Sequence, residues 1–386
     1  MVEREQIKMK EVILMKIISH GIITKPLNDK NFSSNAFPCI VKLPSGRWLG
    51  GFKAAEKKGD CDFVHAVMTW SDDEGKTWVT PFEPIKLPDI NNVSGQSRIL
   101  YFLPLGGTRV LMVINWIDSS DTTKPYYDPE NSSLKDTRIF FCFSEDDGET
   151  WSVPELMNTD PVNDPTPLTG APFMLGDGTI VCQFEINKHD WDKSDWVHKS
   201  AMIFSRDGGR SWSRVVKVTE VPFMYYWDQR PNVMADGRTI VDFFWTLDGK
   251  KQQYQNIHAR ESLDEGRTWG DIWDTGIYGQ PGQPVDLGDG RIATIEIDRT
   301  TTPIITVRTS RDHGRTYDKA FVVYDSKLQK QDSRNVSMND AWDEMTRFSV
   351  GHPTLFNLGE GEILAYYYAG DHSDSTSIEF ARILVK

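Results

Sequence analysis

An eight-residue motif recurs five times along the chain and limits the possible folds more than any other feature. The first copy, Ser71–Trp78, reads Ser-x-Asp-x-Gly-x-Thr-Trp. The other copies begin at Ser144, Ser205, Ser262 and Ser310, and the last ends in Tyr instead of Trp. Ser and Asp side chains bond nearby backbone N–H groups, and glycine supplies the positive φ that closes a tight turn. Apolar runs precede most copies, so each motif is predicted to be a structural hairpin turn between two strands.

A second repeat lies between these turns and gives the number of units. It consists of an apolar segment, a glycine-containing turn and another apolar segment. It occurs six times, with turns at Gly46, Gly106, Gly176, Gly237, Gly288 and Gly359. The sequence therefore predicts an all-β fold, a six-bladed β-propeller of four-stranded antiparallel blades, as a single domain over residues 1–386.

The two ends of the chain are expected to meet in the last blade. The sixth unit supplies three strands, and the apolar N-terminal residues 12–18 are predicted to add the fourth, which would close the ring and hide an open edge. The polar stretch 327–343 is expected to form a long loop or a short helix over one face.

The charge of the chain excludes some classes of partner. The net charge of −13 argues against nucleic acid and anionic membranes. No segment approaches the roughly 18 apolar residues of a membrane helix. The apolar run 12–18 is short and interrupted by Lys16, which is not typical of a secretion signal, so a cytoplasmic location is expected.

The cysteines and histidines give no metal motif. Cys39, Cys61, Cys142 and Cys182 form no C-x-x-C pair and are expected to be free thiols, without disulfides or a zinc site. His189, His352 and His372 are too far apart to suggest ligands of one ion. No metal or cofactor is predicted, and the sequence does not indicate the oligomeric state.

The order of strands predicts which face carries the function. In a meandering blade, both kinds of short turn lie on one face, and the longer, irregular connections lie on the other, where function is usually found. The candidate pocket is therefore lined by the starts of first strands and the ends of second strands, around the central channel.

Polar and charged residues from all six units converge on that face. Glycoside hydrolysis usually needs two carboxylates, and the candidates are Asp60, Asp62, Asp228 and Glu296. An anionic sugar needs arginine partners, and the candidates are Arg98, Arg230 and Arg299. His352 faces the channel, either for acid–base chemistry or as part of the pocket wall. The further candidates for substrate binding are Gln96, Trp245, Gln283 and Tyr367. For each single residue, the alternative is a solvated loop charge, a structural ion pair or core packing.

The five motifs resemble the Asp-box, also called the bacterial neuraminidase repeat, of the sialidase superfamily. The resemblance covers essentially the whole chain and implies a six-bladed propeller. It also implies a site with three arginines, a Tyr/Glu nucleophile pair and an Asp acid/base. The motif is specific for the fold but only weakly specific for activity, because it also occurs in other glycosidases and in binding proteins.

The site residues of the superfamily are matched only in part. Asp60 or Asp62 fits the acid/base position in the loop of blade one. Ala36 stands in place of the first arginine, Asp228-Gln229-Arg230 in place of the glutamate, and His352 in place of the tyrosine. Near the blade-five arginine position the chain has Pro303, with Arg299 close by. The substrate therefore need not be ordinary sialic acid.

Three hypotheses follow. The density of carboxylates and arginines favours an exo-acting, sialidase-like glycosidase for a small, anionic sugar or oligosaccharide. Its acid would be Asp60 or Asp62, its second carboxylate Asp228 or Glu296, and its arginines would hold the substrate. The alternatives are a non-catalytic carbohydrate-binding propeller and a lyase for uronic-acid glycans that uses His352 and a tyrosine.

Overall fold

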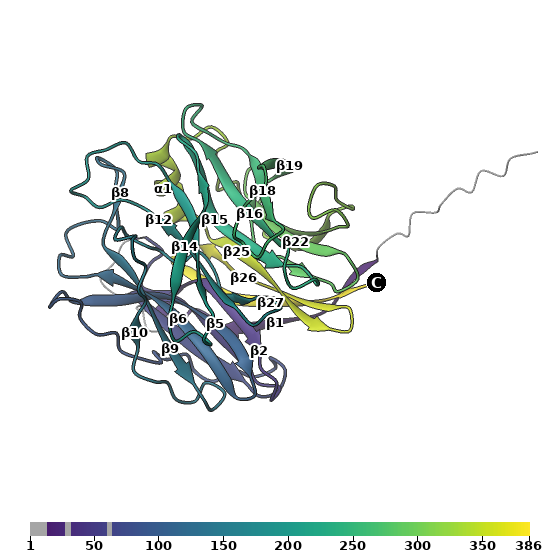
Figure 1. Ribbon diagram of the computed structural model, residues 1–386. Helices are drawn as coiled ribbons and strands as arrows, with labels where there is room; N and C mark the ends of the chain where they lie inside the picture. The colour runs from purple at the N-terminus through teal and green to yellow at the C-terminus, as the bar shows by residue number, and fades with distance from the viewer. Residues whose placement is uncertain (1–13, 28–31, 60–63) are drawn as a thin grey trace, which may run out of the picture.

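The computed structural model describes residues 14–27, 32–59 and 64–386, and these residues form a six-bladed β-propeller (Figure 1). Blade one contains β2 (Ser34–Lys42), β3 (Trp48–Ala55) and β4 (Val64–Ser71). Blade two contains β5 (Gly95–Gly106), β6 (Arg109–Asp118), β9 (Thr137–Ser144) and β10 (Glu155–Leu156). Blade three contains β11 (Phe173–Met174), β12 (Ile180–Ile186), β13 (Lys199–Ser205) and β14 (Ser213–Glu220).

The remaining blades follow the same meander. Blade four contains β15 (Met224–Val233), β16 (Ile240–Asp248), β18 (Asn256–Ser262) and β19 (Trp273–Tyr278), with β17 (Gln253–Tyr254) beside β16. Blade five contains β20 (Gln280–Pro281), β21 (Val285–Asp286), β22 (Ile292–Asp298), β23 (Ile304–Ser310) and β24 (Phe321–Asp325). Blade six contains β25 (Val350–Gly359), β26 (Glu362–His372), β27 (Ser375–Val385) and β1 (Met15–Thr24). The predicted all-β propeller is confirmed.

The first and last strands of the described chain lie side by side in blade six (Figure 1). β1 pairs antiparallel with β27, from Met15 opposite Val385 to Thr24 opposite Ile378. The strand thus begins and ends later than the expected range 12–18, of which residues 12 and 13 lie outside the described residues. This pairing covers the edge of β27 with backbone hydrogen bonds.

Blade one has three strands instead of the four that were expected. After β4, the place of the fourth strand is taken by one bridge, in which Phe82 and Met68 exchange two backbone hydrogen bonds of 2.8 and 3.0 Å. The segment contains Pro81 and Pro84 on either side of Phe82. Because proline has no N–H to donate, a longer ladder cannot form here.

Two short elements cover the face of the propeller that bears the long connections. β7 (Tyr127–Asp128) pairs with β8 (Ser133–Leu134) in the connection between β6 and β9. The helix α1 (Met338–Arg347) lies in the connection to β25; it begins inside the polar stretch 327–343 that was expected to form a loop or a short helix and ends beyond that stretch. The Ser337 hydroxyl caps α1 by accepting from the backbone N–H of Asp340. No helix of the described residues has the length and apolar character required to cross a membrane.

The five repeated motifs are hairpin turns whose polar groups bond within the motif. In the fourth copy, the Ser262 hydroxyl accepts from the backbone N–H of Gly266 at 2.9 Å. The Asp264 carboxylate accepts from the backbone N–H and the hydroxyl of Thr268 at 2.8 and 2.7 Å. The other four copies repeat these contacts. The structural role predicted for the motif is therefore consistent with its geometry.

Substitution of a motif serine is expected to cost stability without affecting the opposite face. In Ser144→Ala, the buried hydroxyl that accepts from Gly148 N–H at 2.8 Å and donates to Asp146 at 2.8 Å is lost. We expect the free energy of unfolding in urea to fall by about 1–2 kcal/mol. Ser375→Ala, at an exposed position, is the control. A Ser144→Ala protein as stable as the control would contradict this role.

Bulges in four innermost strands determine which side chains point into the central channel. The pairing register shifts between Ala36 and Cys39 in β2, and between Ser97 and Leu100 in β5. It also shifts between Trp227 and Arg230 in β15, and between Gly351 and Thr354 in β25. A bulge bends the strand and redirects a side chain, and such bulges are common next to active sites. The residues that begin these bulges are Phe37, Arg98, Asp228 and His352.

Candidate functional site

A cavity of about 150 Å³ lies where the four bulges meet, and all four bulge residues line it. Phe37, Asp228 and His352 have φ values of 56°, 50° and 46°. Residues other than glycine rarely adopt this left-handed conformation, and strained backbone of this kind concentrates at functional sites. The wall is completed by residues from second strands, from connections and from α1, which include Lys58, Asn115, Thr169, Glu185, Trp245, Gln280, Trp342, Phe348 and Tyr368.

Asp228 is the central acidic group of the described site. Its Oδ2 accepts from Gln280 Nε2 at 2.6 Å, and its Oδ1 lies 3.4 Å from Arg230 Nη2. Burial raises the pKa of Asp228 above its ordinary value, although the nearby Arg230 guanidinium lowers it in part. A carboxyl group in this position is suited to carry a proton, which is the requirement for a general acid.

Glu185 supplies a second carboxylate to the same cavity. It lies on β12, and its Oε1 accepts from the backbone N–H of Asp228 at 2.9 Å. Its Oε2 lies 3.2 Å from Nε2 of His198, whose side chain is fully buried. Glu185 was not among the predicted carboxylates, although it comes near the end of a second strand, a position that the meander places at the site.

His352 is held as a neutral imidazole. Burial, reinforced by the cations Arg230, Lys58 and Arg299, keeps the pKa of His352 well below its ordinary value. Its Nδ1 lies 3.2 Å from Arg230 Nη2, and because a guanidinium can only donate, Nδ1 must accept. The proton of the neutral ring is therefore on Nε2, which lies 4.0 Å from Asp228 Oδ2.

A buried lysine and a tyrosine meet at another part of the wall. The Lys58 ammonium group donates to the backbone carbonyl of Phe348 at 2.8 Å and also contacts the Tyr368 hydroxyl. Burial, together with the nearby Arg299 and Lys53, lowers the pKa of Lys58 well below its ordinary value. Burial raises the pKa of Tyr368 to about 12, in spite of Arg299. The pair therefore places a weakly basic amine next to a phenol at the cavity.

Arg299 supports the site from behind. It is 1% exposed, its Nε donates to the carbonyl of Val350 at 2.9 Å, and its Nη2 donates to Gln280 Oε1 at 2.9 Å. The guanidinium lies 4.2 Å from the centroid of the Phe348 ring. Because Gln280 in turn donates to Asp228, Arg299 fixes the orientation of the amide that bonds the central carboxylate.

The structure brings four of the predicted site residues into the cavity wall, which are Arg98, Asp228, Trp245 and His352. Arg230 and Arg299 lie directly behind this wall through the contacts given above. Gln96 lines a neighbouring cavity with Arg98. Gln283 lies at a smaller cavity of about 30 Å³ that also touches Arg230 and His352, and its amide contacts the carbonyl of Pro231. Asp60 and Asp62 lie outside the described residues.

Two further predicted residues, Glu296 and Tyr367, lie away from all three of these cavities. The carboxylate of Glu296 is 3% exposed and pairs with Arg308 Nε at 2.8 Å across β22 and β23, which makes it an internal ion pair of blade five. Tyr367 packs against Tyr324, with 5.1 Å between ring centroids, in the core between blades five and six. Successive residues of a strand point to opposite faces, so its neighbour Tyr368 lines the cavity instead.

Aromatic side chains form much of the remaining wall. Trp245 stacks on Tyr254 with 4.8 Å between ring centroids, and Trp227 lies 5.6 Å from Trp245. Trp342 of α1 stacks on Tyr127 at 4.5 Å, so the helix and the β7–β8 hairpin pack together above the channel. Trp245 and Trp342 both reach the cavity, where an indole face could contact a sugar ring.

The neutral state of His352 predicts a pH dependence of stability. In the unfolded chain this histidine takes up a proton below about pH 6.5, whereas in the folded protein it does not. The unfolded state therefore binds more protons as pH falls through 6.5, and the folded state loses stability. We expect His352→Gln to lose less stability between pH 7.5 and pH 5 than the unmodified protein.

This dependence is measured by urea unfolding at several pH values. The exposed His372 provides the control variant His372→Gln, whose pH dependence should match that of the unmodified protein. If the free energy of unfolding changes with pH equally in His352→Gln and in the unmodified protein, His352 becomes charged in the folded state.

Comparisons with known proteins support this architecture. A family model described as "BNR repeat-like domain" matches residues 112–366. A search of curated proteins finds no match. A protein of unknown function from Dyadobacter fermentans is 18% identical, with a TM-score of 0.73, over 96% of this chain and 99% of that chain.

Two solved enzymes share the fold at lower similarity. The intramolecular trans-sialidase from Ruminococcus gnavus is 15% identical, with a TM-score of 0.63, over 94% of this chain and 96% of that chain. The α-L-arabinanase of Penicillium chrysogenum is 15% identical, with a TM-score of 0.61, over 95% of this chain and 98% of that chain. At these identities the likeness shows the propeller fold.

Proposed function

The chain belongs to the BNR repeat-like domain family and has the propeller fold of sialidases, and on this premise we propose that its central cavity hydrolyses glycosidic bonds. The observation that carries the proposal is the presence of two carboxylates, Asp228 and Glu185, in one cavity at the centre of the propeller. Glycosidases usually employ two carboxyl groups across the scissile bond. The trans-sialidase and the arabinanase of the same fold act on sugars, which is consistent with this reading.

In the proposed reaction Asp228 is the acid/base. Its protonated form, favoured by burial, donates to the glycosidic oxygen, and the bond between that oxygen and the anomeric carbon breaks. Water then adds to the anomeric carbon and returns a proton to the Asp228 carboxylate, which restores the acid. Glu185, which lines the same cavity, would stabilise the positive charge that develops on the sugar. Asp60 or Asp62, from the loop of blade one, remains the proposed alternative acid.

The cations around the cavity predict a negatively charged substrate. Arg98 lines the cavity, and Arg230 and Arg299 lie behind it. The bulges in β5 and β15 bring Arg98 and Asp228 to the same cavity. A guanidinium binds a carboxylate through two parallel hydrogen bonds. We therefore propose a small, anionic sugar or oligosaccharide as the substrate, removed from the end of a chain.

A substrate panel with product analysis tests the proposal. The protein is incubated with aryl glycosides and with neutral and acidic oligosaccharides, and the products are identified by NMR. Release of a reducing sugar together with its alcohol supports hydrolysis. Binding without turnover of any member would instead support a carbohydrate-binding propeller.

The geometry around His352 supports a second candidate, a lyase for uronic-acid glycans. The one unprotonated ring atom of His352 is Nδ1, which could act as the base once a bound uronate carboxylate draws Arg230 Nη2 away from it, and the Tyr368 hydroxyl lines the same cavity and can protonate a leaving oxygen. Elimination removes the proton next to the uronate carboxylate and leaves a double bond in the product. An unsaturated, ultraviolet-absorbing product from a uronate oligosaccharide would favour this candidate over hydrolysis.

A further inference from the structure

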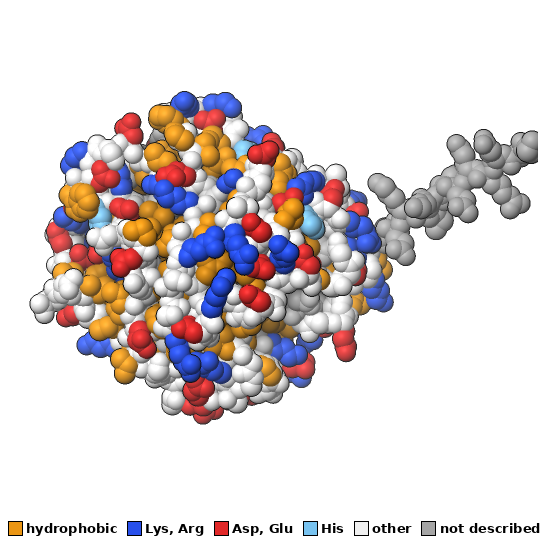
Figure 2. All heavy atoms as spheres, viewed as in Figure 1, with side chains coloured by type: hydrophobic (Ala, Val, Ile, Leu, Met, Phe, Trp, Pro, Cys, Tyr) orange, Lys and Arg blue, Asp and Glu red, His pale blue; other side chains and the backbone are white. Residues whose placement is uncertain are grey.

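A second cavity lies next to the central one and is lined by cations. It measures about 340 Å³, which is within the range of small-ligand sites, and its wall includes Lys53, Arg98, Lys124 and Lys135. None of its described lining residues is acidic. The chain as a whole carries a net charge of −13, and acidic and basic side chains are interspersed over the face seen in Figure 2. Among the described lining residues, charge of one sign is therefore a local feature of this cavity.

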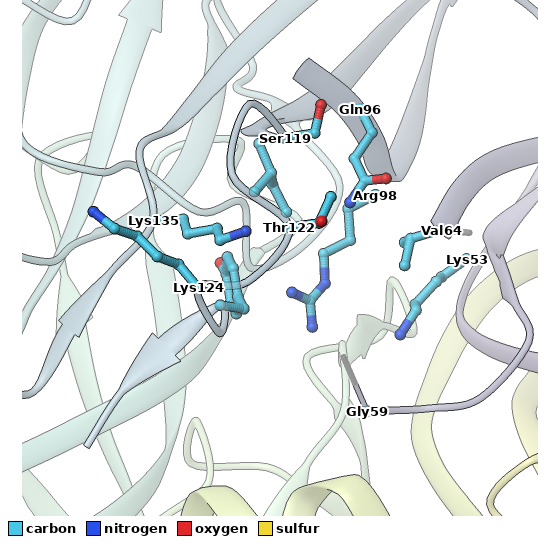
Figure 3. Close-up of a pocket in the computed structure, with 11 residues that line it drawn as sticks. Lys53, Gly59, Val64, Gln96, Arg98, Ser119, Thr122, Lys124 and Lys135 are labelled. Carbon is cyan, nitrogen blue, oxygen red and sulfur yellow. The ribbon is translucent and has the colours of Figure 1, made fainter. Parts of the chain in front are cut away.

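The cationic groups of this cavity differ in where they point (Figure 3). The Arg98 guanidinium and the Lys135 ammonium group extend toward the same space, and the Lys53 ammonium group lies on the far side of Arg98. Lys124 extends away from this space and pairs with Asp190 at 3.0 Å. Within residues 14–27, 32–59 and 64–386, neither Arg98 nor Lys135 forms an ion pair. Lys135 Nζ donates to the backbone carbonyl of Asp121 at 2.8 Å, and this one bond leaves its remaining N–H donors, like those of the Arg98 guanidinium, for an anion.

Arg98 connects this cavity with the central one. Both Arg98 and Tyr126 line the two cavities, and the guanidinium lies 4.0 Å from the centroid of the Tyr126 ring. This stacking holds the planar guanidinium in one orientation between the two spaces. A ligand that extends from Asp228 past Arg98 therefore enters the cationic cavity directly.

We propose that the cationic cavity binds the carboxylate or sulfate of a sugar residue next to the one held at Asp228. This inference rests on the proposed function and extends it, because it makes the substrate an acidic oligosaccharide that occupies two cavities. Arg98 would bind the anionic group through its two-pronged guanidinium, and Lys135 would add a point charge. Gln96, Ser119 and Thr122 line the same cavity and offer partners for sugar hydroxyls.

Calorimetric titration of three matched disaccharides tests this inference. The probes are cellobiose, its glucuronosyl-glucose analogue and cellobiose 6′-sulfate, titrated into the unmodified protein and into Asp228→Asn, which allows binding without turnover. We expect one or both acidic probes to bind on the order of 10-fold more tightly than cellobiose, with affinity that falls as salt is added. The better acidic probe identifies which anionic group the cavity takes.

Variants that each remove one positive charge test whether the tighter binding of the acidic probes arises in this cavity. Lys135→Gln and Arg98→Gln should each weaken the acidic probes on the order of 10-fold, and Lys135→Gln should leave cellobiose binding unchanged. Lys124→Gln removes the same formal charge from a side chain that is engaged with Asp190, so its effect should be smaller than that of Lys135→Gln. Lys319→Gln, at an exposed position in blade five, controls for net charge.

The outcomes separate this inference from the proposed function. Equal binding of all three disaccharides, or equal effects of Lys135→Gln and Lys319→Gln, would overturn the cationic subsite. Turnover of neutral glycosides without charge-dependent binding would uphold the glycosidase and refute the subsite. Charge-dependent binding that Lys135→Gln weakens, together with no turnover of any glycan, would uphold the subsite and refute the glycosidase.

Discussion

Asp228→Asn is expected to lower kcat on the best substrate by about 10²–10⁴-fold, which is the usual contribution of general acid–base catalysis. The amide keeps the shape of the carboxyl group and retains an oxygen for Gln280 Nε2, which donates at 2.6 Å, but it can neither give nor take the proton. Because burial raises the pKa of Asp228, the protonated form persists to higher pH than for an ordinary aspartate. Activity that depends on this acid should decline as pH rises through that raised pKa, and the decline should vanish in the variant.

The measurement is steady-state kinetics across pH, with circular dichroism to confirm folding. Glu155→Gln, at an exposed position in β10, should retain full activity. Asp62→Asn tests the alternative acid in the loop of blade one. If Asp228→Asn is as active as Glu155→Gln while Asp62→Asn is inactive, the acid belongs to that loop. Full activity of both Asp variants would refute both assignments.

The fold could be predicted from the sequence because each turn is determined by the side chains of its own few residues. Each motif bonds its serine and aspartate to its own backbone, so its structure depends little on distant contacts. Six glycine turns then give the number of blades. The prediction was less accurate where contacts between distant residues determine the structure. Examples are the bounds of β1, which pairs with β27, and the missing fourth strand of blade one.

The candidate site was predicted less completely, because the regular alternation of side chains between the two faces of a strand fails at bulges. The meander predicted that Arg98, Asp228 and His352 would lie on one face, and in the structure each begins a bulge in an innermost strand and lines the central cavity. It could not show which of two consecutive tyrosines faces the cavity, and Tyr368 rather than Tyr367 does so. It also could not distinguish Glu296, which a neighbouring strand neutralises through Arg308, from a catalytic carboxylate.

Lys58 shows a different limit of sequence reasoning. It lies in the charged run Lys57-Lys58-Gly59-Asp60, which is typical of a solvated loop. In the structure its amine is buried between the carbonyl of Phe348 and the hydroxyl of Tyr368, which belong to the other end of the chain. No local pattern encodes such a contact, because it arises only when the ring brings blades one and six together.

Gly282→Ala is expected to destabilise the propeller by about 3 kcal/mol or more, because blades five and six have no space for a methyl group at the axis. A Cβ on Gly282 would lie 1.7 Å from the carbonyl oxygen of Pro353 and 2.7 Å from Ile295 Cγ2. The backbone is fixed on both sides, since Gly282 N–H donates to Ile295 O at 2.8 Å and Leu355 N–H donates to Gln283 O at 2.9 Å. The innermost strands can therefore relieve the clash only by separating.

The matched control is Gly270→Ala, whose added Cβ would meet its nearest atom at an ordinary 3.5 Å. Neither glycine has a left-handed φ, so a difference between the two variants measures crowding and not backbone strain. Urea unfolding should place Gly270→Ala within about 0.5 kcal/mol of the unmodified protein. Because Pro353 follows His352, separation of the strands should also displace the imidazole from Arg230 and lower activity in the folded fraction. Equal stability of the two variants would mean that the strands at the axis are less closely packed than the structure shows.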